Sequence, residues 1–152
     1  MSLEKLLEPE AFWRFSLEIY SRNKVKQLCL YCQDQHGLNV NVILLCIWLD
    51  RLKKGLSIQQ CQELVVGIAA SEIKLKQQRS LRSEHKKGSE QYKACLQQEL
   101  ELEAEQQKLL LRILAGMPDT GMDVKPINNY FVAMQIDDEQ TLESLIGAAI
   151  DV

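Results

Sequence analysis

The sequence predicts an all-α fold: a single-domain helical bundle of about six to seven helices with a long antiparallel helical hairpin. Composition is the first observation behind this prediction. More than half of the 152 residues are Ala, Leu, Glu, Lys, Gln, Arg or Met, the better helix formers, and only about a seventh are Val, Ile or Thr. The second observation is a set of helix caps and breakers that divides the chain into amphipathic segments. At this length we expect residues 1–152 to form one domain.

Residues 9–55 are expected to form an aromatic-rich core unit of three helices, because six of the nine aromatic residues occur before residue 49. Pro9 suits the first turn of the first helix. Asn23 is the expected N-cap of the second helix, and Gly37 is expected to end that helix.

The third helix is expected to be the centre of the core. Asn39 can cap it, and the helix should run from Val40 to about Lys54. This segment is apolar on nearly every side as far as Trp48, and a helix that is hydrophobic all round is typically buried.

Residues 57–115 are expected to form the long hairpin. Ser57 and Gln60 have the spacing of a capping box, which should open one continuous helix that reaches about residue 83. The two arms should meet in a turn at Gly88. At 1.5 Å per residue each arm would be about 40 Å long, so the polar tip should project from the rest of the protein.

The charges of the two arms support antiparallel pairing. Residues 72–93 carry a net charge of +4, whereas residues 94–108 carry −3. With a turn near Gly88, Glu99 should lie opposite Lys76. Exposed ion pairs of this kind contribute at most about 1 kcal/mol each, so they would set the register of the arms more than their stability.

Residues 128–150 are expected to form the C-terminal helices, which pack back on the core. Asn128 or Asn129 can cap a short helix. Asp137 and Gln140 repeat the capping-box spacing and predict the start of the last helix.

Charge and cysteine content favour a cytoplasmic protein with reduced thiols. The formal net charge is −3, so the whole protein has no bulk attraction to nucleic acid or anionic lipid. The longest apolar stretch, from Val42 to Leu49, is too short for a bilayer that needs about 20 residues. The N-terminus lacks the apolar run of a secretory signal, and five cysteines do not indicate a disulfide framework. We expect no membrane partner and no cofactor.

The densest polar cluster runs from Gln33 to Asn41, between the second and third helices. A carboxylate is unfavourable near a helix C-terminus, so Asp34 should cap the next helix or pair with an arginine. Asp34 and His36 could instead form a general acid/base pair. Residues two apart on a helix face different ways, however, which disfavours catalysis. A ligand or partner site here would use the polar residues of this cluster and nearby aromatic side chains: Gln33, Asp34, His36, Asn41, Trp13 and Tyr20.

Cys29 and Cys32 form a C-x-x-C, and His36 lies one turn further along the same helix face. A redox pair normally lies at a helix N-terminus after a strand, and a structural zinc site needs a fourth ligand. These residues instead lie within an amphipathic helix. We therefore expect the cysteines to pack in the core and no metal to bind, with a metal site at Cys29, Cys32 and His36 as the weaker alternative.

The hairpin tip is basic. Its cations are Lys74, Lys76, Arg79, Arg82, Lys86 and Lys87, with His85 beside them. They could contact phosphates of a nucleic acid. Apart from Tyr92 no aromatic residue is interleaved for base stacking, so a solvated hairpin end is the favoured interpretation.

The first helices carry a longer pattern: Phe12-Trp13-x-Phe15-Ser16, Tyr20, Cys29-Leu30, Gln33-Asp34-x-His36-Gly37, Val40-Asn41 and Trp48-Leu49. This pattern resembles a proteobacterial family of small uncharacterised all-helical proteins, most closely over about residues 11–54. In that family position 32 is more often a plain aliphatic residue, which speaks against chemistry at the C-x-x-C. The resemblance implies a bacterial, cytoplasmic protein and carries no established activity.

Three functions follow from these observations as hypotheses. No catalytic constellation accompanies the projecting hairpin, so the first is a non-enzymatic protein-interaction or adaptor module, with another protein or a second copy as partner. The second is a small-ligand-binding helical protein or enzyme that uses the Gln33–Asn41 loop, and it predicts an apolar-walled pocket converging on Asp34. The third is contact with nucleic acid through the basic tip.

Overall fold

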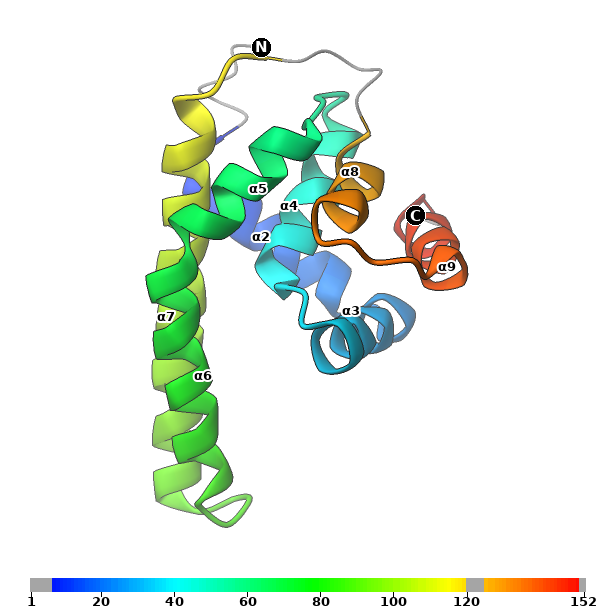
Figure 1. The fold of residues 1–152 in the computed structure, drawn as a ribbon. Coiled ribbons are helices and arrows are strands. Elements are labelled where there is room, and N and C mark those ends of the chain that lie inside the picture. Colours follow the sequence, from blue (N-terminus) through cyan, green and yellow to red (C-terminus); the bar gives the residue numbers. More distant parts are fainter. Residues whose placement is uncertain (1–6, 120–124, 151–152) are drawn as a thin grey trace.

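The computed structural model describes residues 7–119 and 125–150 of the chain. These residues form eight helices and no strand (Figure 1), which confirms the all-α prediction and slightly exceeds the expected number of helices. In chain order the helices are α2 (Pro9–Tyr20), α3 (Asn23–His36), α4 (Val40–Arg51), α5 (Ile58–Gly67), α6 (Ala69–Ser83), α7 (Glu90–Ala115), α8 (Pro126–Ala133) and α9 (Glu139–Ile150).

The helices form two parts, which we name the hairpin (α6 and α7) and the helical body (α2, α3, α4, α5, α8 and α9). In Figure 1 the hairpin runs along one side of the body and extends well beyond it. The upper half of α7 packs against α2, α4 and α5, while the lower half is covered by α6 alone. One flank of α7 therefore faces the body. Which side chains of α7 are covered depends on where the hairpin lies on the body.

Helix α4 is the centre of the body. Eight of its twelve residues are buried, including the continuous run from Asn41 to Ile47. Its neighbours contribute the aromatic side chains of Phe12 from α2 and Tyr130 and Phe131 from α8, all of which are at least 98% buried. A fully buried side chain of this kind stabilises the fold by about 1.5–3 kcal/mol, so α4 anchors the body.

The caps around α3 and α4 are mostly those expected. Gly37 ends α3 at φ 65°, a left-handed conformation that glycine adopts without strain. The Asn39 side chain accepts a 2.9 Å hydrogen bond from the Val42 amide and caps α4. The prediction for Asn23 is wrong, because Asn23 is already helical and Arg22 holds the N-cap position without a side-chain bond. Helix α4 also ends at Arg51, three residues before the expected Lys54.

The first arm of the hairpin is broken, which corrects the expected continuous helix. The predicted capping box of Ser57 and Gln60 is present and opens α5. Helix α5 stops at Gly67, however, and α6 begins two residues later at Ala69. A Cβ on Gly67 would lie 2.5 Å from the Ile113 side chain of α7. The glycine thus permits a close approach of α5 and α7, and the bend after it allows α6 to follow α7 to the tip.

The predicted turn at Gly88 is confirmed, but the predicted ion pair is not. Gly88 has φ 87°, and the Ser89 hydroxyl caps α7 by accepting a bond from the Tyr92 amide. Glu99 pairs with arginines of α6 and not with Lys76. Lys76 lies on the exposed face of α6, because the buried Leu75 sets which side of this helix meets α7.

The C-terminal helices begin at other residues than expected. Helix α8 starts at Pro126, so Asn128 and Asn129 lie inside it and cap nothing. Asn129 instead donates a 2.8 Å hydrogen bond to the Leu56 carbonyl. The last helix is capped by Asp138, one residue after the expected Asp137, because its carboxylate accepts bonds from both the amide and the hydroxyl of Thr141.

Candidate functional site

A pocket of about 470 Å³ lies between the hairpin and the helical body. This volume falls within the range of small-molecule sites, roughly 300–1,000 Å³. Four of the six residues singled out from the sequence line it: Trp13, Tyr20, Gln33 and Asn41. Asp34 and His36 do not, so the pocket does not converge on Asp34.

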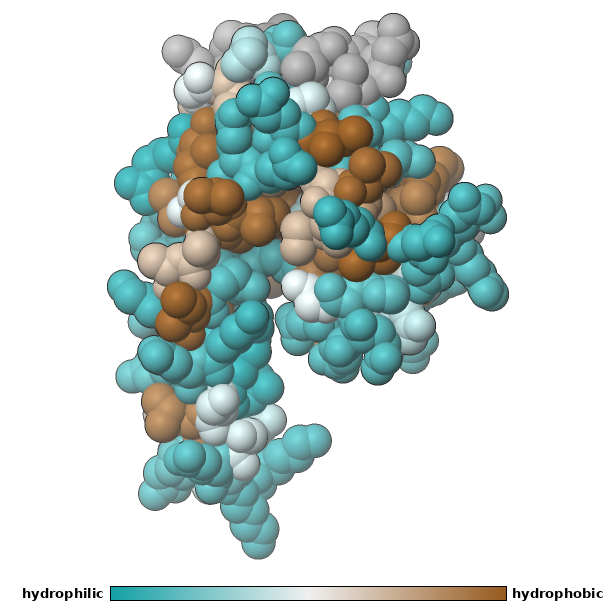
Figure 2. Space-filling model, in the orientation of Figure 1, coloured by the Kyte–Doolittle hydropathy of each residue, from teal (hydrophilic) through white to brown (hydrophobic). Residues whose placement is uncertain are grey.

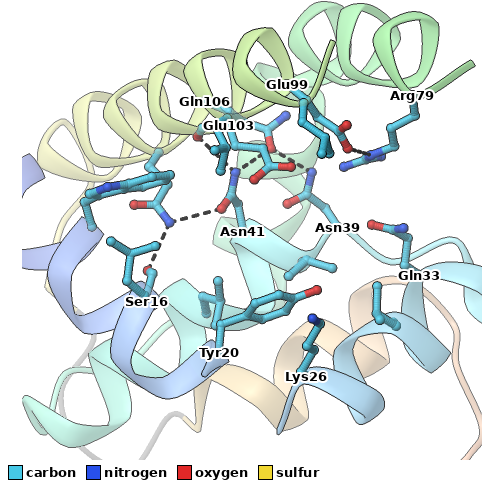
Figure 3. A pocket seen from close by; sticks show the side chains of 18 of the residues that line it. Ser16, Tyr20, Lys26, Gln33, Asn39, Asn41, Arg79, Glu99, Glu103 and Gln106 are labelled. Carbon is cyan, nitrogen blue, oxygen red and sulfur yellow. Dashed lines mark hydrogen bonds and ion pairs between the residues drawn. The ribbon is translucent and has the colours of Figure 1, made fainter. Parts of the chain in front are cut away.

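The pocket has apolar walls and polar groups that converge from both sides. The apolar walls are formed by Trp13 and Leu17 of α2, Leu30 of α3, Val40 and Leu44 of α4, and Leu96 and Leu100 of α7. Figure 3 shows the polar groups facing one another across the space, with Tyr20, Lys26 and Gln33 on the body side and Arg79, Glu99 and Glu103 on the hairpin side. Apolar walls with a few converging polar groups are typical of a ligand site.

The inner end of the pocket is formed by four amide side chains, which we name the amide network: Asn39 and Asn41 of α4 with its cap, and Gln106 and Gln107 of α7. The Gln106 Oε1 accepts hydrogen bonds from the Asn39 Nδ2 at 3.0 Å and the Asn41 Nδ2 at 2.9 Å. All four residues are at least 92% buried. The network therefore joins the hairpin to the body through buried hydrogen bonds, which stabilise a structure only when both partners are present.

The orientation of each amide in the network follows from its neighbours. The Gln106 Nε2 lies 3.3 Å from the Glu72 carboxylate, which can only accept when ionised. The Gln106 oxygen must therefore face the two asparagines, so the Asn41 oxygen accepts from the Gln107 Nε2 at 3.0 Å. The Gln107 Nε2 also donates to the Ser16 hydroxyl at 3.0 Å.

One acceptor remains at the end of this chain of bonds. The Gln107 Oε1 is shielded from solvent and has no hydrogen-bond partner among the described residues. A buried polar atom without a partner destabilises a fold by about 1–3 kcal/mol. This unsatisfied oxygen is therefore a local energetic cost of the amide network.

Two carboxylates of α7 lie one helical turn apart on the hairpin side of the pocket. Glu99 is buried and forms ion pairs with Arg82 at 2.6 Å and with Arg79 at 3.4 Å. Burial, and secondly the charge of Glu99, raises the pKa of Glu103 above 4.5. Within the described part of the chain no hydrogen bond or ion pair satisfies the Glu103 carboxylate, although its backbone carbonyl accepts a bond from Asn41.

Tyr20 forms part of the opposite side of the pocket. Burial raises the pKa of its hydroxyl from 10.0 to about 12, with a smaller contribution from the charge of Glu103. The Lys26 ammonium lies 5.9 Å from the centre of the Tyr20 ring, within reach of a cation–π interaction. The tyrosine is therefore neutral over the physiological pH range and can act as a hydrogen-bonding group, not as a charge.

The structure does not bring Asp34 and His36 together. Asp34 is exposed on α3. The His36 Nε2 lies 2.9 Å from the Asp138 carboxylate and ties α3 to α9. Hydrogen bonds from Thr141, and secondly from His36, lower the pKa of Asp138 from 3.8 to about 2. Neither residue lines the pocket, and the contact joins two helices.

The C-x-x-C is buried within α3. Cys29 and Cys32 are both inaccessible to solvent, and both are free thiols. Burial raises the pKa of Cys29 to about 12 and that of Cys32 to about 11, the opposite of the shift that a redox nucleophile needs. Over the described ranges no three His, Cys, Asp or Glu side chains are grouped as they would be around a metal ion.

The six basic residues of the hairpin do not form one surface. Lys74, Lys76, Lys86 and Lys87 are exposed, whereas the guanidinium groups of Arg79 and Arg82 are directed to Glu99 and line the pocket. The patch available to an external anion is accordingly smaller than the sequence suggests. Separately, none of the described helices is long and apolar enough to span a membrane.

The hairpin side of the pocket was missed at the level of sequence. Glu99, Glu103 and Gln107 are each one turn apart, and a run of charged and amide residues on a long helix usually indicates a solvated face. The available signal was their alternation with apolar residues: Leu96 and Leu100 share this flank of α7.

Comparison with known proteins places the chain in a family. A family model with the description "Protein of unknown function (DUF2390)" matches residues 11–110, about two thirds of the chain. This confirms the resemblance to a family of small uncharacterised proteins and extends it through both arms of the hairpin. Every residue that lines the pocket falls within the matched segment. No curated protein and no solved structure gives a significant match.

Proposed function

The chain belongs to this family of proteins of unknown function, and on that premise we propose that it is a small-ligand-binding helical protein whose ligand occupies the pocket between the hairpin and the helical body. The observation that carries the proposal is a pocket with apolar walls that is bordered by the Glu103 carboxylate, which has no hydrogen bond or ion pair to any described residue. Groups held in energetically unfavourable states are concentrated at functional sites, because structure alone gains nothing from them.

Binding is favoured over catalysis by the residues present. Among the described lining residues there is no histidine or cysteine, and the one serine, Ser16, is bonded to Gln107. The acid/base pair that the sequence suggested, Asp34 with His36, is not formed. What the pocket offers is a shaped apolar volume with hydrogen-bonding groups at defined positions.

The proposal is tested by closing the pocket. Leu100 lines it and is 45% exposed, so Leu100→Trp should fill the entrance without disturbing the core. Val66→Trp is the matched control, because Val66 is 76% exposed on α5 and lies outside the pocket. Saturation-transfer NMR with a library of small organic fragments should show binding to the wild type and to Val66→Trp, and loss of binding to Leu100→Trp. Equal binding to all three proteins, or none to the wild type, would refute the proposal.

A second candidate function is interaction with another protein through the outer face of α5 and α6. Val66 and Ile73 are exposed there, at 76% and 58%, and Figure 2 shows hydrophobic side chains gathered over α5 and the upper hairpin. Contiguous apolar surface of this kind is typical of interfaces. If a second copy is the partner, light scattering should show an oligomer that Val66→Glu dissociates and Val132→Glu on α8 leaves intact.

A further inference from the structure

We infer that the pocket binds an uncharged ligand, an apolar body with one group, such as a hydroxyl or a carboxamide, that both donates and accepts hydrogen bonds. This inference rests on the proposed function, since it names the class of ligand for the same pocket. It is carried by three polar side chains that border the pocket and make no hydrogen bond to another described residue: Tyr20, Gln33 and Glu103.

These three side chains belong to three helices and face the pocket from both sides. Tyr20 of α2 and Gln33 of α3 lie on the body side, and Glu103 of α7 lies opposite them on the hairpin side (Figure 3). All three are half-buried. A polar group that is partly removed from water gains from a new partner, so a ligand that bonds to these groups is stabilised by them.

Together the three groups offer both donors and acceptors. The Tyr20 hydroxyl keeps its proton at neutral pH, because burial raises its pKa to about 12, so it donates as well as accepts. The Gln33 carboxamide also does both, and an ionised Glu103 carboxylate only accepts. A ligand hydroxyl can donate to Glu103 and accept from Tyr20 or Gln33. An ammonium group has no acceptor, and a carboxylate has no donor, so neither ion satisfies both sides.

The charged residues of the lining disfavour a ligand ion of either sign. A cation would meet the positive charges of Lys26, Arg79 and Arg82, and an anion would meet those of Glu99 and Glu103. The two guanidinium groups already pair with Glu99, and Lys26 is exposed, so water can solvate its ammonium group. Moving an ion from water into a partly apolar site is unfavourable unless the site supplies a free counter-charge. An uncharged ligand avoids this loss.

Exposed leucines at the pocket fit the apolar body of the ligand. Leu17 of α2 and Leu100 of α7 both line the pocket and are 53% and 45% exposed. Leu30 of α3 lines it as well. Covering apolar surface of this kind is favourable in proportion to the area removed from water. The leucines therefore contribute affinity, and the polar groups select the head group of the ligand.

The experiment compares four probes that share a six-carbon chain: 1-hexanol, hexanamide, hexylamine and hexanoate. At pH 7 the last two are ionised. Calorimetry or saturation-transfer NMR measures their affinities for the wild type, Tyr20→Phe and Leu100→Trp. Tyr31→Phe is the matched control, because Tyr31 is 46% exposed and lies outside the pocket. We expect the wild type to bind both uncharged probes about tenfold or more tightly than either ion. Tyr20→Phe should weaken that binding about three- to tenfold, and Tyr31→Phe should leave it unchanged.

The outcomes separate this inference from the proposed function. If hexylamine or hexanoate binds as tightly as the uncharged probes and Leu100→Trp abolishes that binding, the ligand class is wrong and the pocket stands. If no probe binds, or if Leu100→Trp binds them all unchanged, both proposals are wrong. A thermal melt checks that Tyr20→Phe is folded, and wild-type affinity of this folded variant for hexanol and hexanamide would also overturn the inference.

Discussion

Replacing Gln106 with alanine should weaken the joint between the hairpin and the helical body. The Gln106 side chain is 99% buried and takes part in four hydrogen bonds, to Asn39, Asn41, Ser71 and Glu72. Two of these partners belong to the body and two to the hairpin. Among the residues that the structure describes, Gln106 is the amide that bonds α6, α7 and the N-terminus of α4 together, and the substitution removes it.

The cost can be worked from what each partner retains. The Asn39 Nδ2 loses its acceptor and stays buried, which lowers the free energy of unfolding by about 1–3 kcal/mol. The Asn41 Nδ2 keeps the Glu103 carbonyl at 3.2 Å, so its loss is closer to one ordinary bond, about 0.5–1.5 kcal/mol. Ser71 and Glu72 are half-buried and can bond to water instead. We expect a total of about 2–4 kcal/mol, a large share of a typical stability of about 5–15 kcal/mol.

Urea unfolding followed by circular dichroism measures this loss. With a slope of about 1–3 kcal/mol per M, the midpoint should fall by about 1–2 M. Gln98→Ala is the control, because Gln98 is exposed on the same helix and the change should be near neutral. If Gln106→Ala costs no more than Gln98→Ala, the amide network does not hold the hairpin to the body.

Three further predictions concern ionisation. The pKa of Glu103 is raised above 4.5, so the fold loses stability as the pH rises from 4.5 through the raised pKa. Glu103→Gln should therefore have a higher melting temperature than the wild type at neutral pH and the same one below pH 4.5. The pKa of Asp138 is lowered from 3.8 to about 2, so its carboxylate stabilises the fold fully above pH 3.8. The difference in melting temperature between the wild type and Asp138→Ala should be largest at neutral pH and should disappear toward pH 2. A difference that stays constant with pH would contradict this role of the carboxylate. Iodoacetamide labelling of the native protein, followed by mass spectrometry, should modify Cys95 first and leave the four buried thiols until denaturant is added, whereas early labelling of Cys29 would show that α3 opens.

Much of the fold could be predicted because its signals are local. The caps at Asn39 and Ser57 bond to residues three positions away, so sequence spacing alone contains the geometry. The break at Gly67 could not be predicted in this way. A glycine is tolerated within a helical pattern, and the reason for this one is Ile113, which is distant in sequence and lies on another helix.

The residues of the candidate site also fall into those that local sequence could predict and those that it could not. Trp13, Tyr20, Gln33 and Asn41 were singled out because polar and aromatic residues are concentrated around α3 and α4, and the fold brings them to one pocket. Glu103 lay in a charged stretch that is typical of a solvated helix. Which flank of α7 is covered depends on how the hairpin docks, and docking involves contacts across most of the chain.

The direction of the amide network also affects how the protein folds. Apolar surfaces can slide past one another at little cost, so hydrophobic contact alone would let the hairpin settle at neighbouring heights on the body. A slip of one helical turn along α7 would place Glu103 or Leu110 where Gln106 now lies. A leucine there would leave the asparagine amides without an acceptor, and with Glu103 there the Gln106 oxygen would lose both of its asparagine donors. Each shifted alignment thus loses buried hydrogen bonds and is less stable. The amide network therefore favours one register of the hairpin on the body.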